Sequence, residues 1–576
     1  MGGWYLCRND ARADARLAQA RAQFARHGFA EPQAFATPTH RGFHVGHIHP
    51  GLATLATEGD DFIAVAGTLF YQGQGGEAAL KRLLADFAPP FDRWTDVLGQ
   101  FGALVRKNNQ LHVFADWFGG FHVYHDASHD VVSTSFLALA QSLTTLRFNR
   151  QAVYEFAFTS TPLGQDTVLD GIARLAPTAQ LSLGEHVTVH QSPRRLPSVV
   201  SDEPVDTLVT RMADQLGRMF EVPARLYGDN VQCPLSGGFD SRLVLALLRQ
   251  AGVRPHVYVY GSARDADVTV ARHIGAAEGF DVEVFDKVAY RQITPDAFAD
   301  IVAHNFHEMD ATPIDGGLFD NGCNSAARHA RARGGALAVS GAAGEIFRNY
   351  FYLRDRPWRS RDILDAFYAG FDPRDCTGTF DESRYFANLD AKLRTSLGVE
   401  DDRLTRQQVE TAYPLFRCPP FFGREISMVG RFGAYFVPFF EHAIVEHSVA
   451  LPVSLRTHGV FQSQLLAAID RRLAAYPSAY GHSFVEQPGL AHRLDDAVSL
   501  YRTPAMRRWS NRLRHRLRRP AAPSGFMAPD YLGRVIDLDF PAMRAFFRVE
   551  RPLDPGLLKR IATLEYLAKN LGSRLK

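Results

Sequence analysis

The sequence predicts two unlike domains, an α+β domain over residues 1–195 and an α/β domain with a parallel sheet over 205–500. Three observations predict them. The first 190 or so residues hold short β-rich runs broken by turn residues, which is typical of antiparallel strands. After about Val205, strand-like and helix-like runs alternate, which favours a parallel sheet with helices on both faces. A polar, proline-rich linker at 192–204 separates the two patterns.

The first domain is expected to begin with a helix and to continue in strands. Leu and Ala recur at helical spacing over 10–28, with charges on the opposite side and Gly28 at the end, so we expect an amphipathic helix there. The strand-like runs are 62–71, 102–116 and 119–126. Turn signals such as Lys107-Asn108-Asn109 break them, which indicates antiparallel strands.

The second domain alternates between helix and strand. The expected order is a helix at 206–220, a strand at 230–235, a helix at 241–252, a strand at 255–261 and a helix at 266–279. No internal repeat interrupts this order.

Residues 501–576 are expected to form an Arg-rich helical extension. The stretch 502–519 carries eight arginines and no acid. We expect a solvated helix whose Leu513 and Leu517 dock on the body of the protein. Binding to RNA, to a phosphate-bearing substrate or to a membrane surface is the alternative.

The composition excludes several classes of protein. The 64 Lys+Arg nearly cancel the 62 Asp+Glu, so no global field attracts nucleic acid, and we do not expect nucleic acid as a partner. No run approaches 18 apolar residues, so we expect no membrane span. The five cysteines are scattered without a CxxC pair, which argues against a disulfide framework and favours the cytoplasm. They are Cys7, Cys233, Cys323, Cys376 and Cys418.

The most informative motif is CPLSGGFDSRLVLALL at 233–248. A buried strand is expected to end at Leu235, and Ser236-Gly237-Gly238 to turn tightly before Asp240-Ser241 opens an apolar helix. Glycines allow close backbone approach, and the free N–H groups at a helix start point at an anion. The turn therefore predicts a pyrophosphate site, and it lacks the GKS or GKT of the Walker A pattern.

SGGFDS resembles the PP-loop of ATP pyrophosphatases, and the chain resembles the asparagine synthetase family. The resemblance implies an N-terminal amidotransferase-like domain of the Ntn type and a PP-loop synthetase domain. It also implies the cofactors ATP and Mg²⁺. Enzymes of this family activate a carboxylate as an acyl-adenylate, release pyrophosphate, and let an amine displace AMP.

Further segments extend the resemblance. HVYVYG is similar to the strand that holds adenine in the family. SGAAGEIFRNY at 340–350 is similar to the family's motif SGxGADExFxGY. It is one residue shorter than that motif, and Gly344 stands in place of the motif's Asp. Residues 427–452 are similar to the segment around VPFLDH, with Glu441 for its Asp. The resemblance assigns Mg²⁺ to Asp240 and Glu345. It assigns ATP to Leu235, Ser236, Gly237, Gly238, Asp240, Ser241, Val259, Tyr260, Gly261, Ser340 and Gly341.

Two departures from the family concern chemistry. The glutaminase of the family uses a Cys that follows the initiator Met, but residue 2 is Gly2, and nothing suggests that Cys7 becomes the first residue. The counterparts of NGEIYN and RDxxGxxPLYY lose the Asn, Glu and Arg of those motifs, so we expect the domain to be inactive. The family's catalytic lysine is also missing, because no lysine lies between Lys392 and Lys559, and we expect Arg456 to replace it beside the catalytic Glu345.

A group of three histidines is a weaker candidate for a functional site. His44, His47 and His49 lie close together in sequence, and two of them share a strand face. A metal site there is disfavoured, because no acid or thiol accompanies them.

The expected function is an asparagine synthetase-like, ATP-dependent ligase that forms amide bonds. Its partners are a small-molecule or peptide carboxylate and either ammonia or a substrate amine, and a homodimer is left open. One alternative is a cyclase similar to β-lactam synthetases or lasso-peptide cyclases. Another, of a different class, is a non-catalytic ATP-binding sensor or assembly protein.

Overall fold

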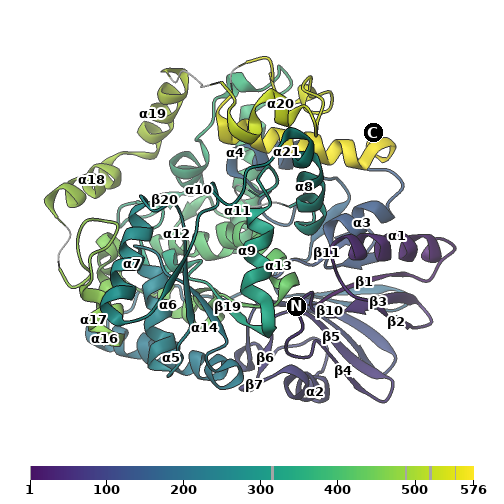
Figure 1. Ribbon diagram of the computed structural model, residues 1–576, viewed down its shortest axis with the longest axis horizontal. Helices are drawn as coiled ribbons and strands as arrows, with labels where there is room; N and C mark the ends of the chain where they lie inside the picture. The colour runs from purple at the N-terminus through teal and green to yellow at the C-terminus, as the bar shows by residue number, and fades with distance from the viewer. Residues whose placement is uncertain (1, 313–316, 487–488, 518–521, 552) are drawn as a thin grey trace.

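The computed structural model describes residues 2–312, 317–486, 489–517, 522–551 and 553–576 (Figure 1). The first part of the chain forms an α+β sandwich, and the second contains a parallel sheet of five strands flanked by helices. Both predictions of fold class are confirmed at this level. Between β15 (Val187–Gln191) and α5 (Val205–Tyr227), where the linker is expected, no helix or strand is present.

Two six-stranded antiparallel sheets pack face to face in the first part, with helices on their outer faces (Figure 1). Alternation along a strand explains these layers. In β1 (Gly3–Arg8), Trp4 Nε1 donates to the Gly102 carbonyl of the second sheet at 3.3 Å, whereas the Tyr5 hydroxyl meets Ser142 Oγ of α3 at 2.7 Å. One sheet has the order β13 (Ile172–Arg174), β11 (Tyr124–Asp126), β12 (Val131–Ser133), β1, β3 (His40–Val45), β2 (Gln33–Ala36); the other has the order β15, β14 (Ala179–Leu183), β10 (Gln110–Ala115), β9 (Phe101–Lys107), β5 (Asp61–Gly67), β4 (Leu55–Glu58).

The helices of the first part cover the two outer faces. Leu80 and Leu83 of α2 (Gly76–Asp86) share a buried cluster with Ile63 and Val65 of β5, on the outside of the second sheet. The remaining elements are α1 (Ala13–Arg26), α3 (Phe136–Ser142), α4 (Arg150–Thr159) and a small sheet of β6 (Phe70–Tyr71), β7 (Gln74–Gly75) and β8 (Val97–Leu98).

The expected helix over 10–28 is confirmed as α1, and the run over 102–116 is the hairpin of β9 and β10. The strand expected over 119–126 is wrong for its first half, because only Tyr124–Asp126 is a strand. The Asp116 carboxylate accepts the backbone N–H groups of Phe118, Gly120 and Phe121 at 2.7 to 3.2 Å. In a strand these backbone N–H groups would donate to a neighbouring strand. Here they donate to the Asp116 carboxylate, so the segment forms a turn.

The parallel sheet has the order β18, β17, β16, β19, β22. The helix expected over 206–220 is longer, since α5 continues through Pro223. The strands are β16 (Val231–Pro234), β17 (His256–Tyr260), β18 (Val282–Phe285), β19 (Leu337–Val339) and β22 (Ala434–Phe436). The helices around them include α6 (Phe239–Gln250), α7 (Ala266–Glu278), α8 (Pro295–Glu308), α9 (Cys323–Ala332), α11 (Glu382–Leu397), α12 (Arg406–Ala412), α13 (Cys418–Phe432), α14 (His442–Val449), α15 (Val453–Arg456), α16 (Val460–Ile469) and α17 (Arg471–Ala475).

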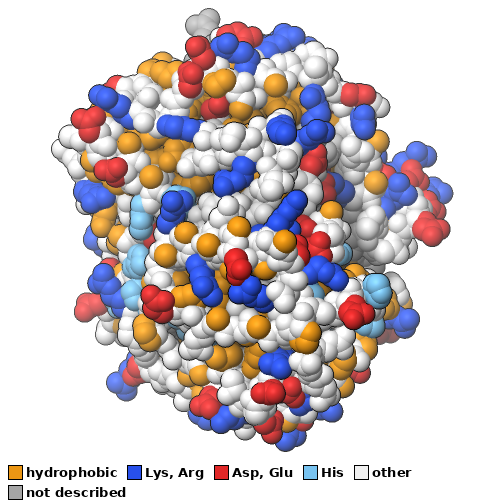
Figure 2. Space-filling model, turned by 90° about the vertical axis from the view of Figure 1, so that its right-hand side faces the viewer, with side chains coloured by type: hydrophobic (Ala, Val, Ile, Leu, Met, Phe, Trp, Pro, Cys, Tyr) orange, Lys and Arg blue, Asp and Glu red, His pale blue; other side chains and the backbone are white. Residues whose placement is uncertain are grey.

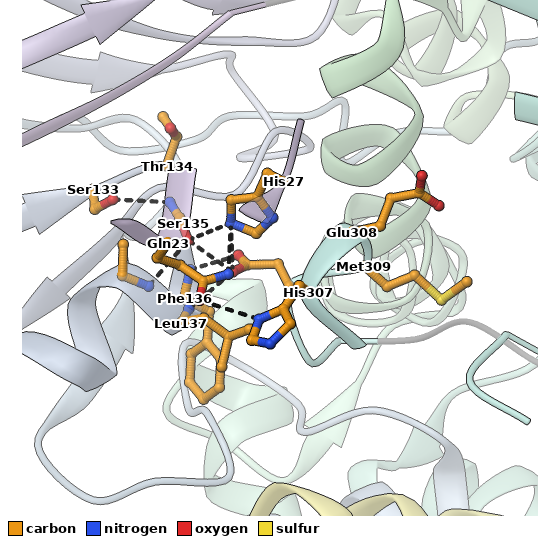
Figure 3. Close-up of polar contacts among 12 residues, drawn as sticks. Gln23, His27, Ser133, Thr134, Ser135, Phe136, Leu137, His307, Glu308 and Met309 are labelled. Carbon is orange, nitrogen blue, oxygen red and sulfur yellow. Dashed lines mark hydrogen bonds and ion pairs between the residues drawn. The ribbon is translucent and has the colours of Figure 1, made fainter. Parts of the chain in front are cut away.

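A buried carboxylate joins the two parts of the molecule, in the region drawn in Figure 3. Asp310, just after α8, accepts the N–H groups of Phe136 and Leu137 at the start of α3 at 2.6 and 2.9 Å. It also pairs with Arg431 of α13 at 2.7 Å and lies 3.5 Å from His27 of α1. Burial by itself would raise the pKa of Asp310, but Arg431 and His27 outweigh it and lower the pKa to about 2. The charged carboxylate therefore holds α3 against the second part.

The C-terminal segment divides between the two parts. α21 (Pro555–Leu571) packs on the first part, where the Arg560 guanidinium donates to the Ala157 carbonyl of α4 at 2.5 Å. α18 (Leu490–Tyr501) and α19 (Pro504–Leu517) lie beside the second part and project at the left edge of Figure 1. The expected docking of Leu513 and Leu517 is wrong, because both side chains are exposed.

No helix among the described residues has the length and apolar character needed to cross a bilayer. On the face of the first part shown in Figure 2, basic and acidic side chains are interspersed, in keeping with a net charge of +2.

Candidate functional site

Three of the segments singled out in the sequence meet at one edge of the parallel sheet. The turn Ser236–Gly238 follows β16, Gly261 follows β17 and Ser340–Gly341 follows β19. β16 lies between β17 and β19 in the sheet. Because chain order changes direction beside β16, this edge is a topological switch point, the place where open α/β sheets bind ligands.

The turn after β16 leads directly into the first turn of α6, and protein acceptors occupy its backbone donors. Ser236 N–H donates to Ser241 Oγ at 2.9 Å, and Gly238 N–H donates to Ser236 Oγ at 3.3 Å. The Gly237 N–H donates to the carboxylate of Asp267, in the first turn of α7, at 2.8 Å. The Asp267 carboxylate thus occupies one donor of the predicted phosphate turn, and a phosphate group bound there would have to displace it.

Asp240 and Arg348 form an ion pair behind this turn. Asp240 Oδ2 lies 2.5 Å from the Arg348 guanidinium, and Oδ1 accepts the amide N–H of Gln462. Burial raises the pKa of Asp240, and Arg348 opposes that rise. Burial lowers the pKa of Arg348, but Asp240 and Glu345 outweigh burial and raise it above its ordinary value. Arg348 is therefore a fixed positive charge at the edge of the sheet.

One donor of Arg348 is unused. Its buried Nε has no hydrogen-bond partner among the described residues. Arg348 also lines a cavity of about 90 Å³ together with Phe239, Asn349, His458, Tyr480 and Asp496. A buried cation with a spare donor beside a cavity favours an anionic ligand.

The described side chains do not fit Mg²⁺ at Asp240 and Glu345. Both oxygens of Asp240 already accept hydrogen bonds, and Glu345 Oε2 accepts the Tyr413 hydroxyl at 2.7 Å. A Cβ on Gly344 would lie 2.2 Å from Asp240 Oδ1, so an acid at 344 has no room here. Within the described residues, no three His, Cys, Asp or Glu side chains are placed to hold a metal. Mg²⁺ binding stays a prediction that these contacts do not support.

The segment predicted to hold adenine ends β17. Val259 is buried, whereas Tyr260 is exposed at the sheet edge with Lys287 Nζ 4.3 Å above its ring. Gly261 has φ +148°, and a Cβ there would lie 2.7 Å from Asp265 Oδ2. Asp265 lies so close to this position that only glycine fits there. The contact of this segment with adenine stays a prediction.

Arg456 lies in the interior at the end of α15. It is 2% exposed, pairs with Glu410 at 3.0 Å, and donates to the carbonyls of Ile346, Leu451 and Ser448. Every guanidinium nitrogen is therefore engaged. Arg456 also lines the 90 Å³ cavity beside Arg348. Its catalytic role stays a prediction.

The glutaminase nucleophile has no counterpart at the start of β1. A Cβ on Gly2 would lie 2.0 Å from the Val45 carbonyl oxygen, so this position has no room for a cysteine side chain. Cys7 is fully buried under α1, with its Sγ 3.9 Å from the Ala13 carbonyl, and burial raises its pKa to about 11. The absence of glutaminase chemistry stays a prediction, and both observations favour it.

The three histidines do not converge. His44 bonds Thr54 at 3.2 Å, whereas His49 reaches across to His329 of α9 at 2.8 Å. His47 is half-buried, and this desolvation lowers its pKa to about 4.

Four residues around the candidate site were not predicted from the sequence. Arg348 stands inside the recognised motif SGAAGEIFRNY, so its charge beside a phosphate turn was a usable signal. Asp267, Tyr413 and Gln462 carried no such signal, because each reaches the site only through the fold.

No protein-family model matches the chain, and none of the curated proteins matches it. Among solved structures, a glutamine phosphoribosylpyrophosphate amidotransferase from B. subtilis complexed with ADP and GMP has 10% identity and a TM-score of 0.24, covering 50% of this chain and 91% of its own. A structure described as the allosteric regulatory enzyme of purine biosynthesis has 10% identity and a TM-score of 0.23, covering 49% and 80%. TM-scores this low do not establish a shared fold.

Proposed function

We propose that the protein is an ATP-dependent ligase of the asparagine synthetase type that forms an amide bond. One observation carries the proposal: the glycine turn, the end of β17 and the Ser340–Gly341 loop meet at the switch point of a parallel sheet, beside the fixed charge of Arg348. Helix starts and switch points favour phosphate groups.

The proposed reaction has two steps. A carboxylate oxygen of the substrate attacks the α-phosphorus of ATP, the bond to the bridging oxygen breaks, and pyrophosphate leaves. An amine then attacks the acyl carbon, loses a proton, and expels AMP. The backbone donors of Ser236–Gly238 bind the pyrophosphate group, and Arg348 offsets the negative charge that grows on it. No step is assigned to Mg²⁺, because the side chains around Asp240 do not fit it.

The amine comes from free ammonia or from the substrate itself. The crowding at Gly2 and the burial of Cys7 support an amidotransferase-like first domain that does not hydrolyse glutamine. A substrate that supplies both carboxylate and amine makes the protein a cyclase.

A non-catalytic nucleotide sensor is the second candidate. It is favoured by the internal partners of the site, since Gly237 N–H already binds Asp267, and Asp240 already binds Arg348 and Gln462. A sensor binds ATP at these groups without adenylating a carboxylate.

Exchange between ATP and labelled pyrophosphate separates the two candidates. A ligase exchanges label when one of a panel of carboxylates is present, and the exchange disappears in Asp240→Asn. Asp281→Asn, an exposed acid of the same part, is the matched control. Tight ATP binding without exchange for any carboxylate contradicts the ligase and supports the sensor.

A further inference from the structure

Helix α19 turns its apolar side chains towards solvent. Met506, Trp509, Leu513 and Leu517 follow one another at intervals of three and four residues, so they share one face of the helix. Their exposed fractions lie between 38% and 73%. A surface helix of a globular protein normally buries such a face.

The basic face of α19 is the one that docks on the protein. Arg508 pairs with Asp365 at 2.9 Å and with Glu382 at 2.5 Å, and Arg512 also pairs with Glu382. His515, on the same side, lies 3.1 Å from the Gly370 carbonyl. The basic face of α19 therefore lies against the protein, whereas its apolar face points to solvent. The apolar face can be buried only against a surface outside this chain's described fold.

The preceding helix continues the exposed apolar face. Leu494, Val498 and Tyr501 of α18 are between 58% and 67% exposed. We call the seven side chains the apolar stripe: Leu494, Val498, Tyr501, Met506, Trp509, Leu513 and Leu517. Exposed apolar surface that runs over two helices marks an interaction site.

The charge around the stripe indicates what covers it. Residues 502–517 contain six arginines and no acid, and Arg514 and Arg516 are exposed on either side of the stripe. An occupant that matches this pattern has an apolar interior and anionic groups at its surface. Trp and Tyr are the side chains that prefer the boundary between hydrocarbon and water.

We propose that the apolar stripe docks on the surface of an anionic phospholipid bilayer, with α18 and α19 lying along it and Arg514 and Arg516 among the headgroups. The inference is independent of the proposed function. It has a consequence for that site, because α18 forms a wall of the 90 Å³ cavity through Asp496 and Leu500 while its other side belongs to the stripe. Docking thus brings the cavity close to the bilayer.

Flotation of the full chain with vesicles tests the proposal. We expect binding to vesicles of phosphatidylcholine and phosphatidylglycerol at three to one, about tenfold weaker binding to phosphatidylcholine alone, and release by salt. Trp509→Ser with Leu513→Ser should lower binding at least tenfold without changing thermal unfolding, because both side chains are exposed. Leu538→Ser, an exposed leucine outside the stripe, is the matched control.

Charge variants complete the test. Arg514→Gln and Arg516→Gln should each weaken binding to the anionic vesicles about fivefold and leave the weak binding to phosphatidylcholine unchanged. Failure of the parent protein to float with anionic vesicles overturns the proposal. So does a stripe variant that floats like the parent. A stripe that instead holds two copies together, or binds RNA, is detected by light scattering or by RNA titration and also overturns it.

Discussion

Asp240 and Arg348 lie 108 residues apart in the chain and form an ion pair 2.5 Å long at the start of α6. The Cβ position of Gly344 falls 2.2 Å from the same carboxylate. The absence of a side chain at Gly344 and the presence of a guanidinium at 348 are thus two parts of one arrangement, in which a protein cation pairs with Asp240.

Replacement of Arg348 should remove the cation from the proposed phosphate site. Arg348→Ala is expected to slow the exchange of ATP with pyrophosphate by about a hundred- to a thousandfold, the usual effect of losing one preorganised donor. Arg348→Lys should recover part of the rate, since charge survives without the planar fork. Arg359→Ala, an exposed arginine, is the control. Exchange within threefold of the parent in Arg348→Ala contradicts the role.

Replacement of Arg456 should affect stability instead of chemistry. Its guanidinium holds Glu410 and three carbonyls in the interior, so Arg456→Ala should lower the free energy of unfolding by about 3 kcal/mol. Urea denaturation measures the change, and pyrophosphate exchange is followed under conditions where the variant is folded. A variant of unchanged stability whose exchange falls a hundredfold supports the catalytic role predicted from the sequence.

Glutamine should be neither a substrate nor a source of covalent label. The Cys7 thiol is buried and has a pKa of about 11, so little thiolate exists at neutral pH. Incubation with glutamine should release no ammonia, and intact-mass analysis with a glutamine-mimicking electrophile should show no adduct. An adduct mapped to Cys7 is the contrary result, and Cys7→Ser controls for labelling at other sites.

Asp310 should contribute stability that depends on pH. Asp310→Asn leaves Arg431 buried without its carboxylate and should lower the free energy of unfolding by about 3–5 kcal/mol at pH 7. The folded pKa of about 2 lies below the unfolded value of 3.8, so this contribution is complete above about pH 4 and is lost as pH falls towards 2. Urea midpoints of parent and variant should therefore converge below pH 4.

The exposed acid Asp296 provides the control for that series. Asp296→Asn should follow the parent at every pH, because a surface ion pair contributes little. A constant difference between parent and Asp310→Asn from pH 7 to pH 2 means that the stabilisation does not come from the charged form.

Much of the local structure was predictable from the sequence. Helical and strand periodicity, read within short windows, predicted α1, the β9–β10 hairpin and the order of strands and helices from α5 to α7. The turn Ser236–Gly238 was predictable for the same reason, since its glycines and the helix after it are adjacent in the chain. Periodicity predicted a strand over 119–123 that is not there. The Asp116 carboxylate accepts backbone N–H groups of this segment, which a strand would use for pairing.

Only the tertiary structure decided which distant groups meet. The sequence predicted an Arg-rich helix at α19 with Leu513 and Leu517 docked on the body. The face that docks was decided instead by Asp365 and Glu382, more than 120 residues away, which pair with its arginines. In the same way Arg348 and Gln462 reach Asp240 only when β16, β19 and α16 come together. The sequence by itself determined the local elements and the glycine turn after β16, because these depend on neighbouring residues. The charge of the site and the exposed stripe depend on long-range contacts, which the fold alone creates.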